Sequence, residues 1–305
     1  MHTDKKHFHW GILYGTLLVL FTAYVLLDTF VIPRSYASVQ SSATEGNQSS
    51  GSQSETSSAA ISSSDTSYDN GSISITLTTS RYCDTTVYVA DITLADVSAL
   101  KTALADDTYG KNITATTSST AESNNAVLAI NGDFYGAQNR GYVIRNGVLY
   151  RDTAMSSDQE DLVIGSDGSF SIITEGETSA QELLDGGAWQ VLSFGPGLLE
   201  NGEITVGANA EVSKSMTSNP RTDIGEISPL HYVMVVADGR TSQSAGLSLY
   251  ELAEYMQGLG VTTAYNLDGG GSSTLYFNGT VVNRPTTDGK TISERKVSDI
   301  VYIGT

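Results

Sequence analysis

The 305-residue chain carries 16 Lys plus Arg against 34 Asp plus Glu, which gives a formal net charge of −18. Nucleic-acid binding needs clustered Lys and Arg, and no basic stripe occurs along this sequence, so we expect no nucleic-acid partner. One cysteine, Cys83, excludes an intramolecular disulfide, and 30 glycines with only 5 prolines suit a β-rich, turn-rich protein.

Residues 11–32 form an apolar run with a single charge, Asp28, and the run is long enough to cross a bilayer. Two lysines precede it, which favours a cytoplasmic segment at 1–10 and an exported remainder. We therefore expect a single-pass signal anchor with the following domain at the cell surface. The alternative is a signal peptide cleaved near Ala37, but the run exceeds the usual signal core of roughly 7–15 residues.

Residues 33–70 are rich in Ser, with Thr, Gln, Glu and Gly among the rest. Such a composition cannot bury enough apolar surface to fold, so we expect a disordered linker that acts as a tether. The globular domain is then expected at 71–305, a length that can bury a core without disulfides.

The first part of this domain alternates between strand signals and one short helical pattern. Strands are expected at 72–78, 86–92 and 126–130, and a short helix at 96–105. Asn-Gly and Asp-Gly pairs then favour tight hairpin turns and therefore antiparallel sheet. There are four such pairs: Asn146-Gly147, Asp167-Gly168, Asn201-Gly202 and Asn278-Gly279.

A different pattern follows, in which an apolar strand at 232–237 precedes a helix and a second strand at 261–267. Ser248 and Glu251 have the spacing of a capping box, which predicts that the helix begins there. Strand, helix and strand in this order predict a βαβ crossover with parallel strands. The expected fold is α+β, with mixed β-sheets rich in antiparallel hairpins, flanking helices and one βαβ unit near the C-terminus.

Three expected strands each end in a compact polar turn, at 131–135, 238–240 and 268–273. Glycine beside each acid lets the backbone approach a ligand, although any one of these turns could simply be a turn. The crossover places Asp238 and Asp268 at the same sheet edge, where ligands commonly bind in open α/β sheets.

Several chemistries fit the sequence poorly. The triple glycine is followed by neither Gly-Lys-Ser/Thr nor a helix, which argues against a phosphate loop and a dinucleotide site. His231 is the only histidine beyond the apolar run, so a His-rich zinc site is excluded and a Ser-His-Asp triad would depend on that residue alone. Paired carboxylates remain, and glycoside cleavage is their commonest use. Clustered Asp and Asn oxygens could bind a divalent cation such as Ca²⁺, but EF-hand spacing is absent and any metal site is unknown.

The same segments resemble the phosphodiester glycosidase family, which has lysosomal members and bacterial surface members linked to exopolysaccharides. The resemblance covers 72–305 and rests on AINGDFYG at 129–136, NPRTDIG at 219–225, VVADGR at 235–240, SLYELAEYM at 248–256, NLDGGGSSTLYFNG at 266–279 and, more weakly, ERKVSDI at 294–300. The chain lacks the disulfide-bearing appended regions of animal members, which suggests a stand-alone bacterial form.

The resemblance implies a hydrolase that cleaves a sugar from a phosphodiester at the anomeric carbon. We expect sugar-1-phosphate linkages of cell-envelope or extracellular polysaccharides as the substrate. The expected catalytic carboxylates are Asp268, Asp238 and Asp133. The expected substrate-binding residues are Asn131, Arg221, Thr222, Arg240, Gly269, Gly270, Gly271, Ser272, Ser273 and Arg295, with the arginines holding phosphate unless they are surface ion pairs.

Two alternatives stay open. A non-catalytic protein with the same pocket would bind a surface polysaccharide during exopolysaccharide biosynthesis or export. A phosphodiesterase that cuts the P–O bond would usually need two metal ions, for which the sequence supplies few histidines. The sequence does not separate nucleophile from base.

Overall fold

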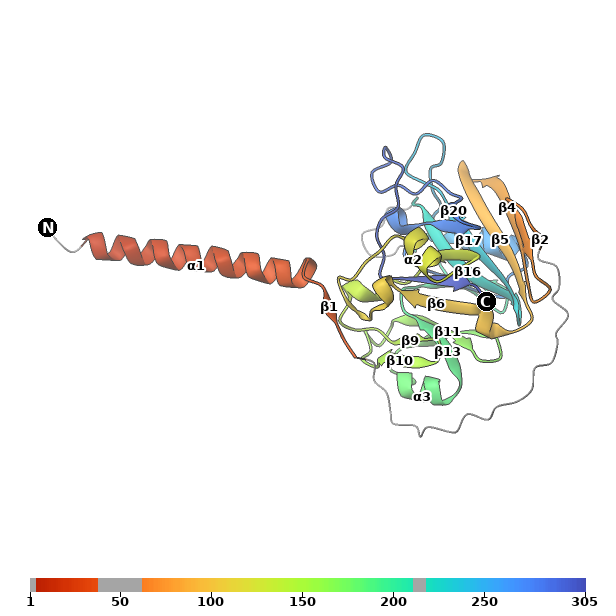
Figure 1. Ribbon diagram of the computed structural model, residues 1–305, viewed down its shortest axis with the longest axis horizontal. Helices are drawn as coiled ribbons and strands as arrows, with labels where there is room; N and C mark the ends of the chain where they lie inside the picture. The colour runs from red at the N-terminus through yellow and green to blue at the C-terminus, as the bar shows by residue number, and fades with distance from the viewer. Residues whose placement is uncertain (1–3, 38–61, 211–217) are drawn as a thin grey trace.

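The computed structural model describes residues 4–37, 62–210 and 218–305. Helix α1 (Asp4–Phe30) projects alone from a β-rich domain (Figure 1). Within the described residues, the segment Trp10–Phe30 is the one helix long and apolar enough to cross a membrane. Length and composition alone fit both a membrane anchor and a signal sequence.

The largest sheet has nine strands in the order β15-β14-β18-β16-β17-β5-β4-β3-β2, and all neighbours are antiparallel. Its strands are β2 (Ser62–Ser63), β3 (Ser67–Asp69), β4 (Ile73–Tyr82), β5 (Thr85–Leu94), β14 (Gly197–Glu200), β15 (Glu203–Ile204), β16 (Arg221–Ser228), β17 (His231–Ala237) and β18 (Thr263–Asn266).

Two five-stranded sheets pack with it, in the orders β20-β19-β8-β21-β6 and β10-β9-β13-β11-β12. The first contains β6 (Leu100–Leu104), β8 (Leu128–Asn131), β19 (Leu275–Phe277), β20 (Thr280–Val281) and β21 (Asp299–Ile303). The second contains β9 (Val143–Arg145), β10 (Val148–Arg151), β11 (Glu160–Gly165), β12 (Phe170–Thr174) and β13 (Ala188–Leu192). One continuous apolar core draws on all three sheets, for example through Ile75, Ile130 and Leu162.

The helices of the domain are short and lie outside this core. They are α2 (Thr117–Ser123), α3 (Ala180–Asp185), α4 (Leu249–Gly258) and the 3₁₀ turns η1 (Val97–Ala99), η2 (Ala105–Asp107), η3 (Tyr135–Ala137) and η4 (Gly270–Ser272). A separate two-stranded ladder joins β1 (Arg34–Ser35) to β7 (Gly110–Lys111). The α+β fold expected from the sequence is confirmed.

All four predicted hairpin turns are present, between β9 and β10, β11 and β12, β14 and β15, and β19 and β20. Asn146, Asn201 and Asn278 each have φ near +50°, and the glycines that follow them also have positive φ. Asparagine and glycine tolerate this conformation, and the resulting turn matches the twist of the flanking strands. Local turn chemistry therefore determines these hairpins.

The predicted crossover exists with one difference. Strands β17 and β18 are both antiparallel to β16 and hence parallel to one another, but β16 lies between them. Helix α4 connects them and begins with the predicted capping box of Ser248 and Glu251. The inserted strand comes from earlier in the chain, so the sequence of the crossover itself gives no sign of it.

Two other expectations differ from the structure. Residues 96–105 form turn η1 and strand β6 rather than a helix, because Leu100, Thr102 and Ala103 are buried where β6 pairs with β21. Part of the segment predicted as a linker at 33–70 forms strands, because β1 pairs with β7, β2 with β3 and β3 with β4. Residues 38–61 lie outside the described residues.

Candidate active site

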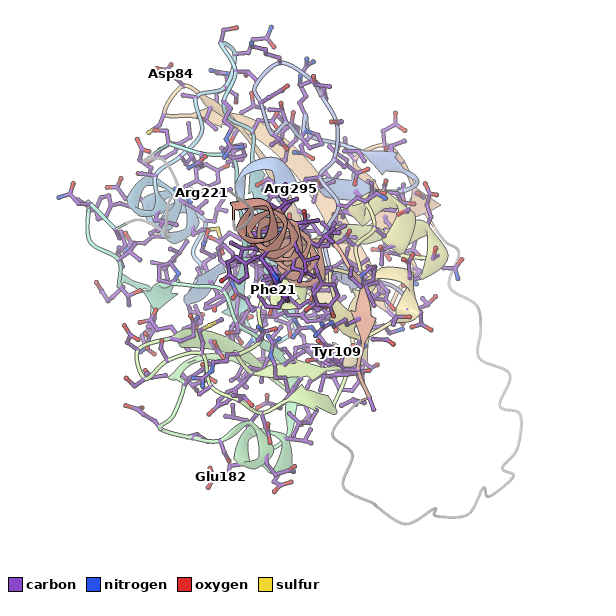
Figure 2. The ribbon with its side chains drawn as sticks, turned by 90° about the vertical axis from the view of Figure 1, so that its left-hand side faces the viewer. Phe21, Asp84, Tyr109, Glu182, Arg221 and Arg295 are labelled. Atoms are coloured by element: carbon purple, nitrogen blue, oxygen red, sulfur yellow. The ribbon has the colours of Figure 1, made fainter. Side chains whose placement is uncertain are left out.

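The antiparallel pairing of β16 with both neighbours assembles the site. Arg221 begins β16 opposite Ala237, the last residue of β17, and the Leu267 N–H donates to the Thr222 carbonyl just past the end of β18. Asp238 and Asp268 therefore follow their strands at one sheet edge, as the sequence predicted, with the start of β16 between them. Figure 2 labels the buried Arg221 and the partly exposed Arg295 near one another in the view along α1.

The third polar turn joins this edge from the neighbouring sheet. Asn131, at the end of β8, donates its side-chain amide to the Asp268 carbonyl at 2.5 Å. The Asp268 N–H in turn donates to the Gly132 carbonyl at 3.3 Å. The Asn131 Oδ1 accepts the Thr222 hydroxyl at 2.8 Å, and both side chains are buried. Asn131 and Thr222 thus brace the loop that carries Asp268.

Asp268 is buried and held by two partners. Its Oδ2 accepts the Ser272 hydroxyl at 2.6 Å and Arg295 Nη2 at 2.9 Å, and Arg295 also donates Nε to Ser272 Oγ at 2.8 Å. Burial raises the pKa of Asp268, although Arg295 and Ser272 oppose the shift by stabilising the ionised form. The Arg295 side chain is 39% exposed, so this pair faces solvent on one side.

Arg240 provides a second guanidinium beside the glycine loop. It donates Nε and Nη2 to Asn219 Oδ1 at 3.2 and 3.0 Å, and Nη1 to the Thr287 carbonyl at 2.8 Å. Burial and the nearby Arg295 lower the pKa of Arg240. Among the described residues Arg240 forms no ion pair, so its charge remains available to an anion.

The three glycines are needed because the loop passes close to two other segments. An added Cβ on Gly269 would lie 2.9 Å from the Pro220 carbonyl oxygen, and one on Gly271 would lie 2.2 Å from Thr287 Oγ1. Gly270 has φ +61°, and its added Cβ would lie 2.8 Å from Arg240 Nη2. Side chains at these positions would push the arginine and its supporting loops away from Asp268.

Asp238 is held by residues that the sequence analysis missed. Its Oδ1 accepts Asn283 Nδ2 at 3.1 Å and the Arg284 N–H at 3.0 Å, and its Oδ2 accepts the Tyr88 hydroxyl at 3.3 Å. Asn283 also donates to the Ser273 carbonyl at 2.9 Å and so links the two acidic loops. Asn283 lies two residues after β20, the second strand of a predicted hairpin, and this position is visible in the sequence, whereas Tyr88 lies in an ordinary strand pattern.

Asp133, the third acid expected to be catalytic, is engaged by protein donors on both sides. Both its oxygens accept protein donors: Oδ1 the Tyr135 N–H at 3.0 Å, and Oδ2 the Ser193 N–H and Arg145 Nη2, each at 2.8 Å. Arg145 also contacts Asp299 at 2.9 Å, and all three charged side chains are buried. These contacts tie the 131–135 loop to Ser193 and Arg145.

The remaining expected residues have unequal roles. Arg221 is buried and donates Nε to the Leu247 carbonyl at 2.9 Å. Ser272 is buried and engaged with Asp268, while the buried Ser273 hydroxyl has no hydrogen-bond partner among the described residues. Within that part of the chain no three His, Cys, Asp or Glu side chains form a group that could hold a metal ion.

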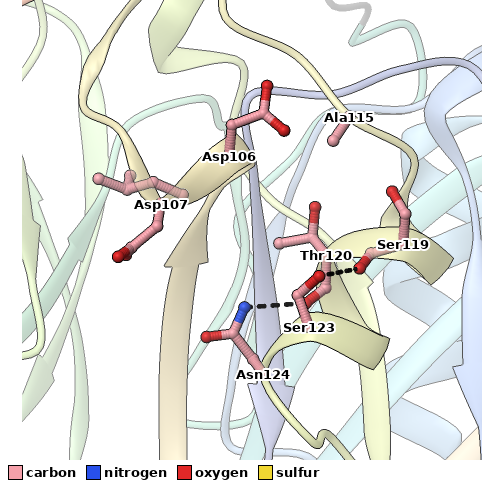
Figure 3. A pocket seen from close by; sticks show the side chains of 8 residues that line it. Asp106, Asp107, Ala115, Ser119, Thr120, Ser123 and Asn124 are labelled. Carbon is pink, nitrogen blue, oxygen red and sulfur yellow. Dashed lines mark hydrogen bonds between the residues drawn. The ribbon is translucent and has the colours of Figure 1, made fainter.

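A separate hollow of about 400 Å³ lies between the turn at Asp106 and Asp107 and helix α2 (Figure 3). Hydroxyl and amide side chains line its α2 side, including Ser119 and Asn124. No residue of the expected site lines it, so we do not connect it with the carboxylates.

The phosphodiester glycosidase family model matches residues 124–304, which include every expected site residue. The chain belongs to this family. It is 30% identical over 207 residues to the human N-acetylglucosamine-1-phosphodiester alpha-N-acetylglucosaminidase, a match that covers 62% of the chain and 40% of that protein. It is 29% identical over 199 residues to the SPbeta prophage-derived uncharacterized protein YomE of Bacillus subtilis, covering 64% and 30% respectively. Each match spans less than half the length of the relative concerned.

Solved structures of similar fold include the zebrafish N-acetylglucosamine-1-phosphodiester alpha-N-acetylglucosaminidase catalytic domain, described as auto-inhibited by its pro-peptide. Its TM-score is 0.61 at 21% identity, covering 76% of this chain and 83% of that one. A hypothetical protein from Synechocystis has a TM-score of 0.51 at 16% identity, covering 76% and 62%. These likenesses support the fold of the family.

Proposed function

We propose that the domain hydrolyses sugar-1-phosphate diesters by breaking the bond between the anomeric carbon and its oxygen. The observation that carries the proposal is the juxtaposition, at one glycine-rich loop, of two guanidiniums and a buried carboxylate. Arg240 and Arg295 flank this loop, and Asp268 lies within it. In a chain of net charge −18, such a concentration of positive charge fits an anionic substrate.

The arginines are the groups best suited to the phosphate. A guanidinium can hold two phosphate oxygens at once, and Arg240 has no acidic partner among the described residues. Several backbone amides of the loop are already used, because Gly270, Ser272 and Ser273 donate their N–H groups within the protein. We therefore propose that arginine side chains, rather than a cluster of backbone N–H groups, bind the phosphate.

The carboxylates account for the bond cleavage. The leaving group is a phosphate monoester anion, which departs with little need for a general acid. A carboxylate is still required, either to activate water or to attack the anomeric carbon as the sugar gains positive charge. Asp268 and Asp238 are the acids at this edge, and Asp133 is assigned to positioning.

The substrate and its location extend the proposal. The names of the animal relatives point to an N-acetylglucosamine-1-phosphodiester as the first compound to try. If α1 is an uncleaved anchor with the domain outside, the natural substrates are phosphodiester-linked sugars of the cell envelope or of extracellular polysaccharides. The alternative function is to bind such a carbohydrate phosphate without cleaving it. Measuring turnover distinguishes this alternative from hydrolysis.

The test uses the full chain in detergent with the ethyl diester of N-acetylglucosamine 1-phosphate. We expect free sugar and ethyl phosphate in equal amounts. Asp268→Asn should abolish release, whereas Asp185→Asn, an exposed change on α3, should leave it unchanged. Binding of the diester without turnover, equally in wild type and Asp268→Asn, would favour the binding protein instead.

A further inference from the structure

The chain leaving helix α1 docks directly on the domain. Strand β1 pairs with β7, with Arg34 opposite Lys111 and Ser35 opposite Gly110, and the Tyr36 N–H donates to the Tyr109 carbonyl at 2.8 Å. Because Arg34–Tyr36 follow α1 directly, this contact fixes where the helix leaves the domain.

Two side-chain features fit this docking. An added Cβ on Gly110 would lie 1.8 Å from the Arg34 carbonyl oxygen and 2.7 Å from Ile113 Cδ1, so glycine is required for the strands to approach. Asn112, with φ +57°, donates its side-chain amide to the carbonyls of Thr29 and Ile32 at 3.3 Å each. It thereby satisfies carbonyls at the end of α1 that no helical turn can reach.

The same docking segment contacts the loop that enters the candidate site. The Asn112 N–H donates to the Gly136 carbonyl at 3.0 Å, and the Tyr109 ring stacks on the Tyr135 ring with centroids 5.3 Å apart. Tyr135 is the last residue of the 131–135 loop that carries Asp133, and Gly136 follows it. Figure 2 looks along α1, and Arg295, whose side chain is 39% exposed, is labelled close beside the helix in this view.

The domain exposes few large apolar side chains. Apart from α1 and the residues just after it, only Tyr36, Phe134 and Ile292 are exposed large apolar side chains in the described part of the chain, at 48%, 42% and 44%. Phe134 has φ +75°, a costly conformation for a bulky residue, in the site loop itself. Ile292 lies three residues before Arg295. Two of these exposed apolar side chains therefore belong to the segments that carry site residues, Phe134 beside Asp133 and Ile292 shortly before Arg295.

We propose that docking of Arg34–Tyr36 holds the candidate site toward the bilayer that contains α1, and that the substrate is a glycosyl phosphoryl lipid in that bilayer. The proposal rests on the function proposed above and on α1 remaining uncleaved. Water adds to the anomeric carbon, the bond from that carbon to the phosphate oxygen breaks, and free sugar and a lipid phosphate monoester form. The proton released by water passes through a site carboxylate to solvent. Phe134 and Ile292 contact the lipid chain beside the phosphate.

The first experiment compares two substrates with the full chain in vesicles. One is a sugar 1-phosphate esterified to a long-chain alcohol in the same vesicles, and the other is its water-soluble ethyl diester at equal total concentration. Confining enzyme and substrate to one surface raises their effective concentration, so we expect the lipid to be cleaved roughly tenfold faster or more. Equal rates for the two substrates in wild type would overturn the lipid assignment.

The docking is tested with Gly110→Val combined with Asn112→Gly. We expect this variant to lose most of the preference for the lipid while cleaving the soluble diester within about twofold of wild type. Gly258→Ala is the matched control, because its added methyl meets no atom within 4 Å. A variant that retains the full preference would overturn the role of docking.

A second measurement does not depend on activity. Arg34→Cys with Lys111→Cys, in a Cys83→Ala background, should form a disulfide on mild oxidation, because directly opposed antiparallel residues lie within bonding range. Arg34→Cys with Asp185→Cys should not. Failure of the first pair to cross-link would overturn the docking. If neither diester is cleaved, the proposed function is wrong and the lipid assignment falls with it, while the cross-link still decides the docking.

Discussion

Asp268 and Arg295 form the pair on which the proposed chemistry depends. Burial raises the pKa of the carboxyl, and the arginine opposes that shift. A phosphate bound by Arg295 would share its positive charge and change the balance at Asp268. The pair therefore couples binding of the leaving-group phosphate to the protonation of Asp268.

Removing that arginine should change the pH dependence of the reaction. In Arg295→Gln the opposing charge is gone, so the pKa of Asp268 rises further and the acid limb of kcat/KM moves to higher pH, by about one unit or more. The exposed Arg140→Gln serves as control. An unchanged acid limb in Arg295→Gln would show that Asp268 is not the ionising group.

Arg240 should act mainly on phosphate affinity. Because it contacts the glycine loop and has no acidic partner among the described residues, Arg240→Gln should weaken competitive inhibition by inorganic phosphate roughly tenfold or more, as expected for a charged hydrogen bond. The thermal midpoint should change little. Equal inhibition of Arg240→Gln and wild type would place the phosphate elsewhere.

At the scale of elements, a buried cluster of three charged side chains joins strands β9 and β21 to the 131–135 loop. Arg145 on β9 contacts Asp299 on β21 and Asp133 in the site loop. Burial would lower the pKa of Arg145, but the two carboxylates outweigh it and raise the pKa. One buried cation thus serves two carboxylates, and burial together with Asp133 raises the pKa of Asp299 to about 7.

Arg145→Met should therefore be strongly destabilising. It leaves two carboxyls buried without their cation, which costs about 3–5 kcal/mol of unfolding free energy. Urea denaturation measures the loss, with Arg140→Gln as the exposed control. A change below about 1 kcal/mol would contradict the view that this cluster holds the site loop in place.

The elements also show what can be predicted from sequence. The hairpin turns and the capping box at Ser248 depend on neighbouring residues, so local chemistry predicts them. The shared edge of Asp238 and Asp268 follows from strand direction. The insertion of β16 and the partners of Asp238 and Asp133 depend on residues far away in the chain, such as Tyr88, Arg145 and Asn283. Residue spacing carries no information about such pairings, so the contacts of Asp133 with Arg145 and Ser193 could not be predicted.

At the scale of the whole molecule, buried acids influence how stability depends on pH. Burial and the neighbouring Glu175 raise the pKa of Asp161 to about 9. The folded state then holds a proton that the unfolded chain releases near pH 4. Between these values the folded state binds more protons, so this group's contribution to stability declines as pH rises through about 9.

Asp161→Asn should remove that decline. Relative to wild type, the variant should gain stability steadily as pH is raised from about 5 to 9, measured as the difference in unfolding free energy at each pH. The exposed Asp185→Asn should show no such trend. A constant difference between Asp161→Asn and wild type across this range would contradict the buried, protonated state of Asp161.

The molecule as a whole combines the fold of the phosphodiester glycosidase family with a net charge of −18. The segment after helix α1 pairs with the domain through β1 and β7. The fold brings positive charge to one loop of an otherwise acidic chain. The proposed function assigns a phosphodiester substrate to this charge and the attack on its sugar to the neighbouring carboxylates. The proposed function requires that the bond between the anomeric carbon and its oxygen breaks, and not the P–O bond.

Hydrolysis in ¹⁸O-labelled water tests that claim most directly. With the ethyl diester of N-acetylglucosamine 1-phosphate, we predict that the label appears in the anomeric hydroxyl of the released sugar and not in ethyl phosphate. Label in the phosphate monoester would show cleavage of the P–O bond and contradict the account.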